Sequence, residues 1–138
     1  MNHQERNVKM IRKTLFAAVC ACAVTGCVST AEKPVWVLCR FDLKPETSRA
    51  EYIERTQAIV DTVRAEEGCC EYRLLGDAVT DWEKPQRFGD RTLWMLEKWA
   101  SIGALKAHLE TPHMKAFGPK VRPMRANGTF HVLEDVAD

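Results

Sequence analysis

Residues 35–43 alternate in character with a period of two. The odd positions are all apolar, namely Val35, Val37, Cys39, Phe41 and Leu43. The even positions are mixed, namely Trp36, Leu38, Arg40 and Asp42. Because successive side chains of a strand point to opposite faces, this pattern predicts a β-strand with one face in the core and the other only partly solvated.

A helix is predicted after Lys44-Pro45, which breaks this strand. Ser48 and Glu51 have the S-x-x-E spacing of a capping box, in which each residue satisfies a backbone N–H of the other. Apolar residues then recur near the helical period, at Ile53, Ile59, Val60 and Val63. Gly68 is predicted to provide the C-terminal stop.

Three further strands are predicted from apolar runs bounded by turn residues. They occupy residues 69–79, 91–99 and 128–136. The connection 80–90 is long and polar, and it is predicted to form an exposed hairpin, a lid or a partner contact.

Two short helices are predicted between the last two strands. Ser101 caps the first, and Thr111 caps the second, with Pro112 in the first turn where proline is tolerated. Gly118-Pro119 and Pro123 are predicted to end this helical region. The first of these helices has an apolar stripe made of Ile102, Leu105 and Leu109.

The predicted order β-α-β-β-α-(α)-β is that of a ferredoxin-like α+β fold with an antiparallel sheet. Residues of the strand 91–99 are apolar on both faces: Leu93, Met95 and Trp99 on one, Trp94 and Leu96 on the other. Helices can cover only one side of a four-stranded sheet. We therefore expect the same sheet of a second copy to cover the other side, in an isologous homodimer.

The first 26 residues have the make-up of a secretory signal peptide, with Lys9, Arg12 and Lys13 before an apolar run at 15–24 that is too short to span a bilayer. The run closes on Val24-Thr25-Gly26-Cys27, which resembles the lipobox of bacterial lipoproteins. This resemblance implies that Cys27 is acylated and becomes the mature N-terminus. A plain signal peptide or an uncleaved membrane segment are the alternatives.

No Asp follows Cys27, and the lipoprotein sorting pattern then implies the outer membrane of the cell envelope, facing the periplasm. The predicted organisation is a signal peptide at 1–26, a tether at 27–34 and one folded domain at 35–138. Without the signal peptide the chain keeps 112 residues, 16 basic and 18 acidic. This balance gives no reason to expect nucleic acid as a partner.

Three cysteines remain in the predicted mature chain: Cys39, Cys69 and Cys70. They have no zinc-type spacing, and each is interpreted as a small buried hydrophobe. A disulfide is compatible with an oxidising compartment, but the sequence does not give its pairing.

Two segments carry a family resemblance, AEEGCCEYRLL at 65–75 and LEKWASIGALKAHLETPHMKAF at 96–117. Together they resemble the antibiotic biosynthesis monooxygenase family, and within it the small quinol-monooxygenase-like members. The likeness covers roughly residues 35–136. It implies a dimeric α+β barrel that oxygenates electron-rich phenols or quinols with O₂ and no cofactor. The matching residues are Glu67, Gly68, Cys69, Tyr72, Glu97, Trp99, Ala107, His108, Thr111, His113 and Phe117.

His108 and His113 are the candidate catalytic residues. His113 lies in the first turn after Thr111, where the helix dipole should disfavour imidazolium and leave a neutral base. His108 borders the apolar stripe of the preceding helix. The sequence does not decide which is the base, and both are also compatible with structural roles: His108 closing its helix and His113 packing on Phe117. A metal site is not predicted, because no third ligand has a fixed spacing to them.

Such a reaction needs a dry cavity, flat walls and a charge to stabilise a phenolate. Trp36, Tyr72, Trp99 and Phe117 are the candidate walls. Arg40 is the candidate counter-charge, with Glu97 or Asp42 as its partner, and an ordinary salt bridge at the dimer interface is the simpler interpretation of Arg40. The predicted partners are a small aromatic or quinol-like molecule, oxygen, a second copy and the membrane.

Other functions compete with this interpretation. A haem-degrading relative would need a histidine at 117–122, which contains none. An isomerase acting on phosphorylated autoinducer-2 has a similar A-x-H-x-x-T-P-H stretch, but an exported protein would not meet that cytoplasmic substrate. A lipid-anchored dimer that binds a small ligand, or a partner through residues 80–90, without catalysis is the remaining alternative.

Overall fold

The computed structural model describes residues 32–137, so the predicted signal peptide at 1–26 and the predicted acylation site Cys27 lie outside the described residues. The elements are β1 (Val35–Leu43), α1 (Arg49–Arg64), β2 (Cys69–Leu75), β3 (Thr92–Trp99), α2 (Ile102–Glu110), α3 (Pro112–Val121), the 3₁₀ turn η1 (Arg122–Met124) and β4 (Arg125–Leu133). This order confirms the predicted ferredoxin-like α+β fold.

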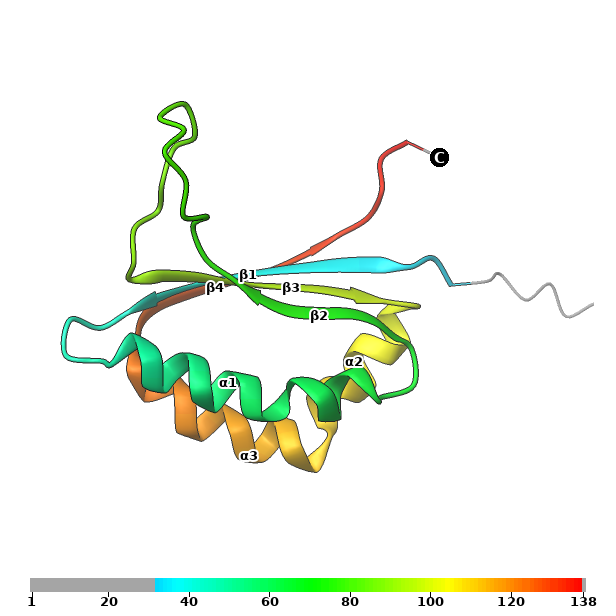
Figure 1. Cartoon of the computed structure of the whole chain (residues 1–138). Helices are drawn as coiled ribbons and strands as arrows, with labels where there is room; N and C mark the ends of the chain where they lie inside the picture. The colour runs from blue at the N-terminus through cyan, green and yellow to red at the C-terminus, as the bar shows by residue number, and fades with distance from the viewer. Residues whose placement is uncertain (1–31, 138) are drawn as a thin grey trace, which may run out of the picture.

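The four strands form one antiparallel sheet in the order β2-β3-β1-β4. All three helices lie on one side of it, and the connection between β2 and β3 rises as an arm on the other side (Figure 1). We call the helix-covered side the inner face and the opposite side the outer face. Within residues 32–137, no helix combines the length and apolar character needed to cross a membrane.

The inner face of the two central strands is the core, as the alternation in β1 predicts. Every odd position of β1 is buried and every even position is half-buried. In β3 the inner face carries Leu93, Met95, Glu97 and Trp99, while Trp94 and Leu96 are half-buried on the outer face. The helices close the core with Tyr52, Thr56, Val60, Val63, Leu105, His108, Phe117 and Val121.

The predicted N-terminal caps of all three helices are present, but the capping box of α1 is only half formed. Ser48 Oγ accepts a hydrogen bond from the backbone N–H of Glu51 at 3.2 Å, but the Glu51 carboxylate binds Arg55 instead of returning to Ser48. Ser101 and Thr111 cap α2 and α3 as predicted. The predicted stripe on α2 is wrong at two positions, because Ile102 and Leu109 are exposed and α2 buries Leu105 and His108 instead.

Of the two predicted stops of the helical region, Gly118-Pro119 is wrong, whereas Pro123 lies in the 3₁₀ turn with which the region ends. Helix α3 continues through Gly118-Pro119 to Val121. Proline in the last turn removes one N–H donor, and the buried side chains of Phe117 and Val121 keep this turn packed against the sheet. Bounds of three strands differ as well. β2 ends at Leu75 and not at Val79, β3 begins at Thr92 and not at Arg91, and β4 runs from Arg125 to Leu133, three residues earlier than predicted at each end.

Gly68 acts in the turn between α1 and β2, since the helix itself ends at Arg64 with Ala65 as its C-cap. Its φ is +82°, and a Cβ there would lie 2.6 Å from Cβ of Ala104. Only glycine meets both demands without strain. This close approach brings the end of α1 against α2, which places Glu66 beneath the two histidines.

Candidate active site

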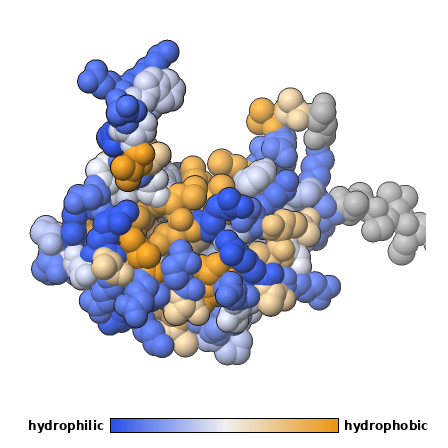
Figure 2. Space-filling model, in the orientation of Figure 1, coloured by the Kyte–Doolittle hydropathy of each residue, from blue (hydrophilic) through white to orange (hydrophobic). Residues whose placement is uncertain are grey.

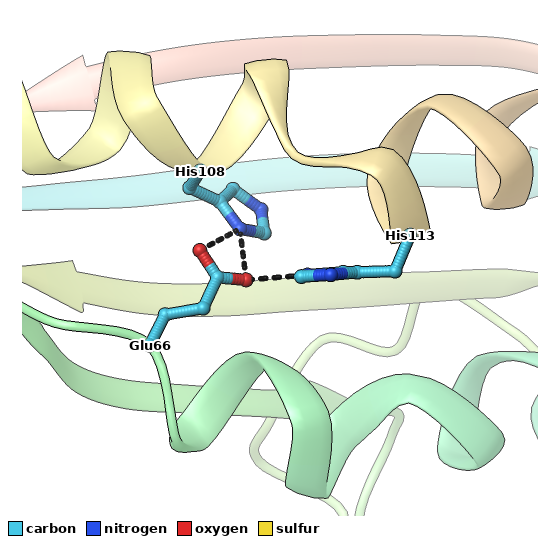
Figure 3. Close-up of side chains that lie close together, drawn as sticks. All are labelled: Glu66, His108 and His113. Atoms are coloured by element: carbon cyan, nitrogen blue, oxygen red, sulfur yellow. Dashed lines mark hydrogen bonds and ion pairs between the residues drawn. The ribbon is translucent and has the colours of Figure 1, made fainter.

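Glu66, His108 and His113 form a hydrogen-bonded cluster where the C-terminal end of α1 meets the junction of α2 and α3 (Figure 3). Nδ1 of His108 lies 2.9 Å and 3.1 Å from the two carboxylate oxygens of Glu66. Nε2 of His113 lies 2.6 Å from Oε1 of the same carboxylate. One glutamate therefore holds both imidazoles.

His108 is the buried member of this cluster, with 1% of its surface exposed. Its ring lies 4.6 Å from that of Trp99 and 5.8 Å from that of Tyr72, centroid to centroid. Burial lowers the pKa of His108, and the hydrogen bond and charge of Glu66 oppose that shift. The imidazole is thus favoured in its neutral form.

The contact with Glu66 also decides the tautomer of His108. A carboxylate can only accept, so Nδ1 carries the proton and Nε2 presents a lone pair. Nε2 is buried and has no hydrogen-bond partner among residues 32–137. A neutral imidazole held in this way is suited to accept a proton from a bound molecule.

A cavity of about 580 Å³ lies between the inner face of the sheet and the helices, with His108 in its wall. This volume suits a small organic molecule. The side chains of β1, β2 and β3 at its wall are Cys39, Phe41, Tyr72, Met95 and Glu97. The other lining residues are Thr56, Leu109, Met114, Phe117, Val121, Arg122 and residues 125–130.

Glu97 is a second titratable group in the cavity wall. It is buried, and its Oε2 accepts a hydrogen bond of 2.8 Å from the indole N–H of Trp99. Burial raises the pKa of Glu97 to about 7, with the negative charge of Glu66 adding to the shift and the Trp99 bond opposing it. Near neutral pH this carboxyl group can hold a proton.

The three clustered residues are also a potential metal-ligand set, since one ligand atom from each lies within 4.8 Å of the others. Glu66 is the third ligand that has no fixed spacing to the histidines in the sequence. A metal on Nδ1 of His108 would, however, leave Nε2 as a buried N–H without an acceptor. Metal-bound histidines almost always donate that second N–H. The donor set therefore fits a hydrogen-bonded acid/base cluster better than a metal centre.

The sequence-predicted site residues fall into three groups. His108, Tyr72, Glu97 and Phe117 line the cavity. Trp99 is fully buried behind Glu97 and His108, and His113 contacts Glu66 and Thr111 outside the lining. Trp36 and Arg40 do not line the cavity: they belong to the outer face of β1.

Of the two predicted partners of Arg40, Asp42 is the one that it binds. Its Nε donates to Asp42 at 3.0 Å, while Glu97 lies on the other face of the sheet. The guanidinium also lies over the rings of Phe88, at 5.5 Å, and Trp94, at 6.0 Å. Trp36 is covered by Lys98, whose Nζ lies 4.5 Å from the ring centroid.

Sequence reasoning missed two functional candidates, Glu66 and Arg125. Glu66 was visible as the first of two adjacent glutamates, of which the second, Glu67, was chosen. Glu67 is exposed, and the turn at Gly68 determines that Glu66 faces the histidines. Arg125 lies at the far end of the cavity, where its Nε donates to the Tyr52 hydroxyl at 2.7 Å.

The chain as a whole can be assigned to a known family. Residues 34–120 match the sequence profile of the antibiotic biosynthesis monooxygenase family, and the chain belongs to that family. A relative from Escherichia coli strain K12, named "Probable quinol monooxygenase YgiN", is 38% identical over 74 residues, which are 54% of this chain and 70% of the relative.

Solved structures have the same fold. Rv0793 from Mycobacterium tuberculosis superposes with a TM-score of 0.63 at 25% identity, over 77% of this chain and 98% of that one. SnoaB from Streptomyces nogalater, described as a cofactor-independent oxygenase, gives a TM-score of 0.62 at 14% identity, over 77% of this chain and 96% of that one. At that identity the likeness to SnoaB shows the fold alone.

Proposed function

We propose that this protein is a cofactor-independent monooxygenase that oxidises a quinol or related polyphenol with O₂, and that His108 is its general base. The observation that supports this most directly is the unpartnered, buried Nε2 of His108, a residue that lines the cavity between the sheet and the helices. Membership of a family with monooxygenase-named relatives supports the reaction class.

The first step of the proposed reaction is removal of a proton from a substrate hydroxyl by Nε2 of His108. Glu66 accepts from Nδ1–H and stabilises the imidazolium that forms, as the carboxylate does in other His–carboxylate pairs. His113 binds the same carboxylate and keeps it in place. In this proposal His108 is the catalytic residue, and Glu66 and His113 are positioning residues.

The phenolate then passes one electron to O₂, and the two radicals combine to form a C–O bond at a ring carbon. Protonation gives a hydroperoxide, and loss of the ring C–H proton with cleavage of the O–O bond releases water and leaves a carbonyl. One oxygen atom enters the product, a hydroxyquinone, and the other leaves as water. The quinol supplies all the electrons, so the balance requires no external reductant.

Glu97 is the proposed proton donor to the departing oxygen. Its carboxyl group lines the cavity and holds a proton near neutral pH, because burial raises its pKa to about 7. The aromatic rings of Tyr72 and Phe117 form the walls that hold a flat substrate and exclude water.

Oxygen uptake with a panel of uncharged hydroquinones tests this function, with ¹⁸O₂ labelling to show incorporation of one atom. We expect His108→Gln to lose roughly 100-fold or more in rate, the range of a general base. His113→Gln, which removes only a positioning contact to Glu66 and lies outside the cavity lining, should lose clearly less than His108→Gln. Unchanged thermal melting of both variants shows that the fold is intact.

The rate should also depend on pH in a defined direction. His108 must be neutral, so the rate falls on acidification below its lowered pKa. Glu97 must be protonated, so the rate falls above about pH 7.

The proposal is refuted by the absence of oxygen uptake with every hydroquinone, or by full activity in His108→Gln. Ligand binding without uptake would favour a binding protein.

We further propose that two copies associate through the outer faces of their sheets, and that the chain is exported and held at the membrane by acyl chains on Cys27. The lipobox-like Val24-Thr25-Gly26-Cys27 supports the second proposal. Wild-type protein should then partition with the membrane fraction, and mass spectrometry of its N-terminal peptide should show acylated Cys27. Cys27→Ser should abolish both, and wild-type protein found unacylated in the soluble fraction would contradict the proposal.

A further inference from the structure

The cavity has two chemically different ends. His108 and Glu97 line one end. Glu97 pairs with Val37, so this end lies beside Val37 of β1. The guanidinium of Arg125 occupies the other, 3.6 Å from the ring centroid of Phe41. Val37 and Phe41 are four residues apart on one strand, so the two ends are separated by about 13 Å along it.

The side chain of Arg125 is fixed in this position by aromatic contacts. Its Nε donates to the hydroxyl of Tyr52 at 2.7 Å, and its guanidinium carbon lies 5.5 Å from the Tyr52 ring and 3.6 Å from the Phe41 ring. Stacking on Phe41 and the bond through Nε use one edge and one face of the guanidinium. The two terminal nitrogens remain for another acceptor.

No such acceptor is supplied by the part of the chain that the structure describes. Three other arginines form ion pairs with a nearby carboxylate: Arg40 with Asp42, Arg55 with Glu51 and Arg73 with Glu71. Arg125 has no carboxylate within ion-pair distance among residues 32–137. A half-buried cation that lines a cavity without a counter-charge is costly unless a ligand provides one.

The positive charge of Arg125 affects the pKa values of neighbouring groups, of which Cys39 lines the cavity. Burial raises the pKa of Cys39 to about 12 and also raises that of Tyr52, and in both cases the positive charge of Arg125 opposes the rise. Arg122, which is exposed, adds a second positive charge at the same end of the lining. This end of the cavity therefore favours a negative group.

We propose that the substrate is a hydroxyaromatic molecule that carries a carboxylate at the end remote from its reacting hydroxyl, and that Arg125 binds this carboxylate. The planar fork of a guanidinium matches a carboxylate with two parallel N–H···O bonds. Bound in this way, the acid directs its hydroxyl end toward His108 and Glu97. The assignment of the hydroxyl as the reacting group depends on the proposed oxygenase function, whereas the carboxylate site does not.

The test is a binding measurement that needs no turnover. The probes are 6-hydroxy-2-naphthoic acid, a rigid molecule with its hydroxyl and carboxylate at opposite ends, and its uncharged methyl ester. Titration calorimetry with the wild-type protein should show the acid bound roughly tenfold or more tightly than the ester, the usual gain from a charge-assisted hydrogen bond. Added salt should weaken binding of the acid and leave binding of the ester unchanged.

Arg125→Gln should remove the preference: the acid loses roughly tenfold or more in affinity while the ester is bound as before, which also shows that the cavity is intact. Arg125→Lys should retain part of the preference, since it keeps the charge without the fork. Arg122→Gln is the matched control for a general loss of positive charge, and it should change the preference less than Arg125→Gln does.

Equal wild-type affinities for acid and ester would overturn the proposal, as would an Arg125→Gln variant that weakens both probes equally. The outcome is separable from that of the oxygenase test. A preference for the acid that depends on Arg125, without oxygen uptake on any quinol, rejects the oxygenase and keeps the carboxylate site. Uptake of uncharged hydroquinones with no preference for the acid rejects the site and keeps the oxygenase.

Discussion

At the scale of single residues, Glu97 is a group whose charge near neutral pH depends on the fold. Burial raises its pKa from 4.5 in the unfolded chain to about 7 in the folded protein. The folded state therefore binds a proton that the unfolded chain releases. This contribution to stability is fully present below pH 4.5 and is lost as pH rises through about 7.

We predict that Glu97→Gln is more stable than wild type at pH 8 and equally stable at pH 4.5. Glutamine keeps an oxygen to accept from Trp99 and cannot ionise. The gain in the free energy of unfolding at pH 8 should be about 1–3 kcal/mol, since each unit of pKa shift corresponds to about 1.4 kcal/mol. Urea denaturation at the two pH values measures it.

Glu71→Gln is the matched control for this prediction. The carboxylate of Glu71 binds Arg73, and that hydrogen bond lowers the pKa of Glu71, the opposite direction to Glu97. It should therefore give no gain in stability at pH 8. Stabilities of Glu97→Gln and wild type that run parallel between pH 4.5 and pH 8 would show that Glu97 does not titrate in this range.

Single residues also mark the limit of what the sequence predicts about the site. Both histidines were found, because His-containing motifs near helix caps are local patterns. Glu66 was missed, because two adjacent glutamates differ only in how the turn at Gly68 aims them. Arg125 was missed, because its partner Tyr52 is 73 positions away in the chain.

At the scale of elements, the sequence predicts what depends on side-chain periodicity. The alternation in β1 identified its bounds and its buried face correctly. Strand ends depend instead on backbone partners, which the sequence does not display. β2 ends at Leu75, where its pairing with β3 ends opposite Trp94, and the apolar Ala78 and Val79 that extended the prediction lie beyond the paired residues.

The same distinction explains the helices near the site. The caps at Ser101 and Thr111 are local and were predicted, but the buried face of α2 was not. That face includes His108 because the helix is rotated toward the cluster with Glu66, a contact between residues 42 positions apart. A polar residue that faces inward breaks the apolar pattern from which sequence analysis infers burial.

At the scale of the whole molecule, the outer face of the sheet carries many apolar side chains among charged ones, and no helix covers it. Figure 2 shows hydrophobic surface at the foot of the β2–β3 arm and along the level of the sheet. By the strand register, the outer-facing apolar residues include Trp36, Leu38, Leu75, Trp94, Leu96 and Leu133. Leu75 and Leu133 are 40% and 47% exposed, which is unfavourable for a surface left in water.

Phe88 connects the arm to this face. Its ring lies 5.0 Å from that of Trp94, and Arg40 lies over both. Further apolar side chains of the arm, Val79 and Trp82, are exposed. An arm that stands beside the outer face in this way is placed to contact a second copy seated on it (Figure 1).

We predict that the Cys27→Ser protein sediments as a dimer and that Leu38→Glu converts it to monomers. Leu38 lies on the central strand β1, so the substitution brings a charge into the middle of the proposed interface. The dimer should weaken roughly 100-fold or more, since an unpaired buried charge costs several kcal/mol. Ile102→Glu, an equivalent change at an exposed position of α2, should leave the dimer intact.

The same variant separates assembly from ligand binding. The cavity is lined by residues of the inner face and the helices, whereas Leu38 lies on the outer face. Monomeric Leu38→Glu should therefore keep the wild-type preference for the naphthoic acid over its ester. Loss of that preference on dissociation would mean that the partner completes the cavity, and sedimentation of the unsubstituted protein as a monomer would remove the proposed interface altogether.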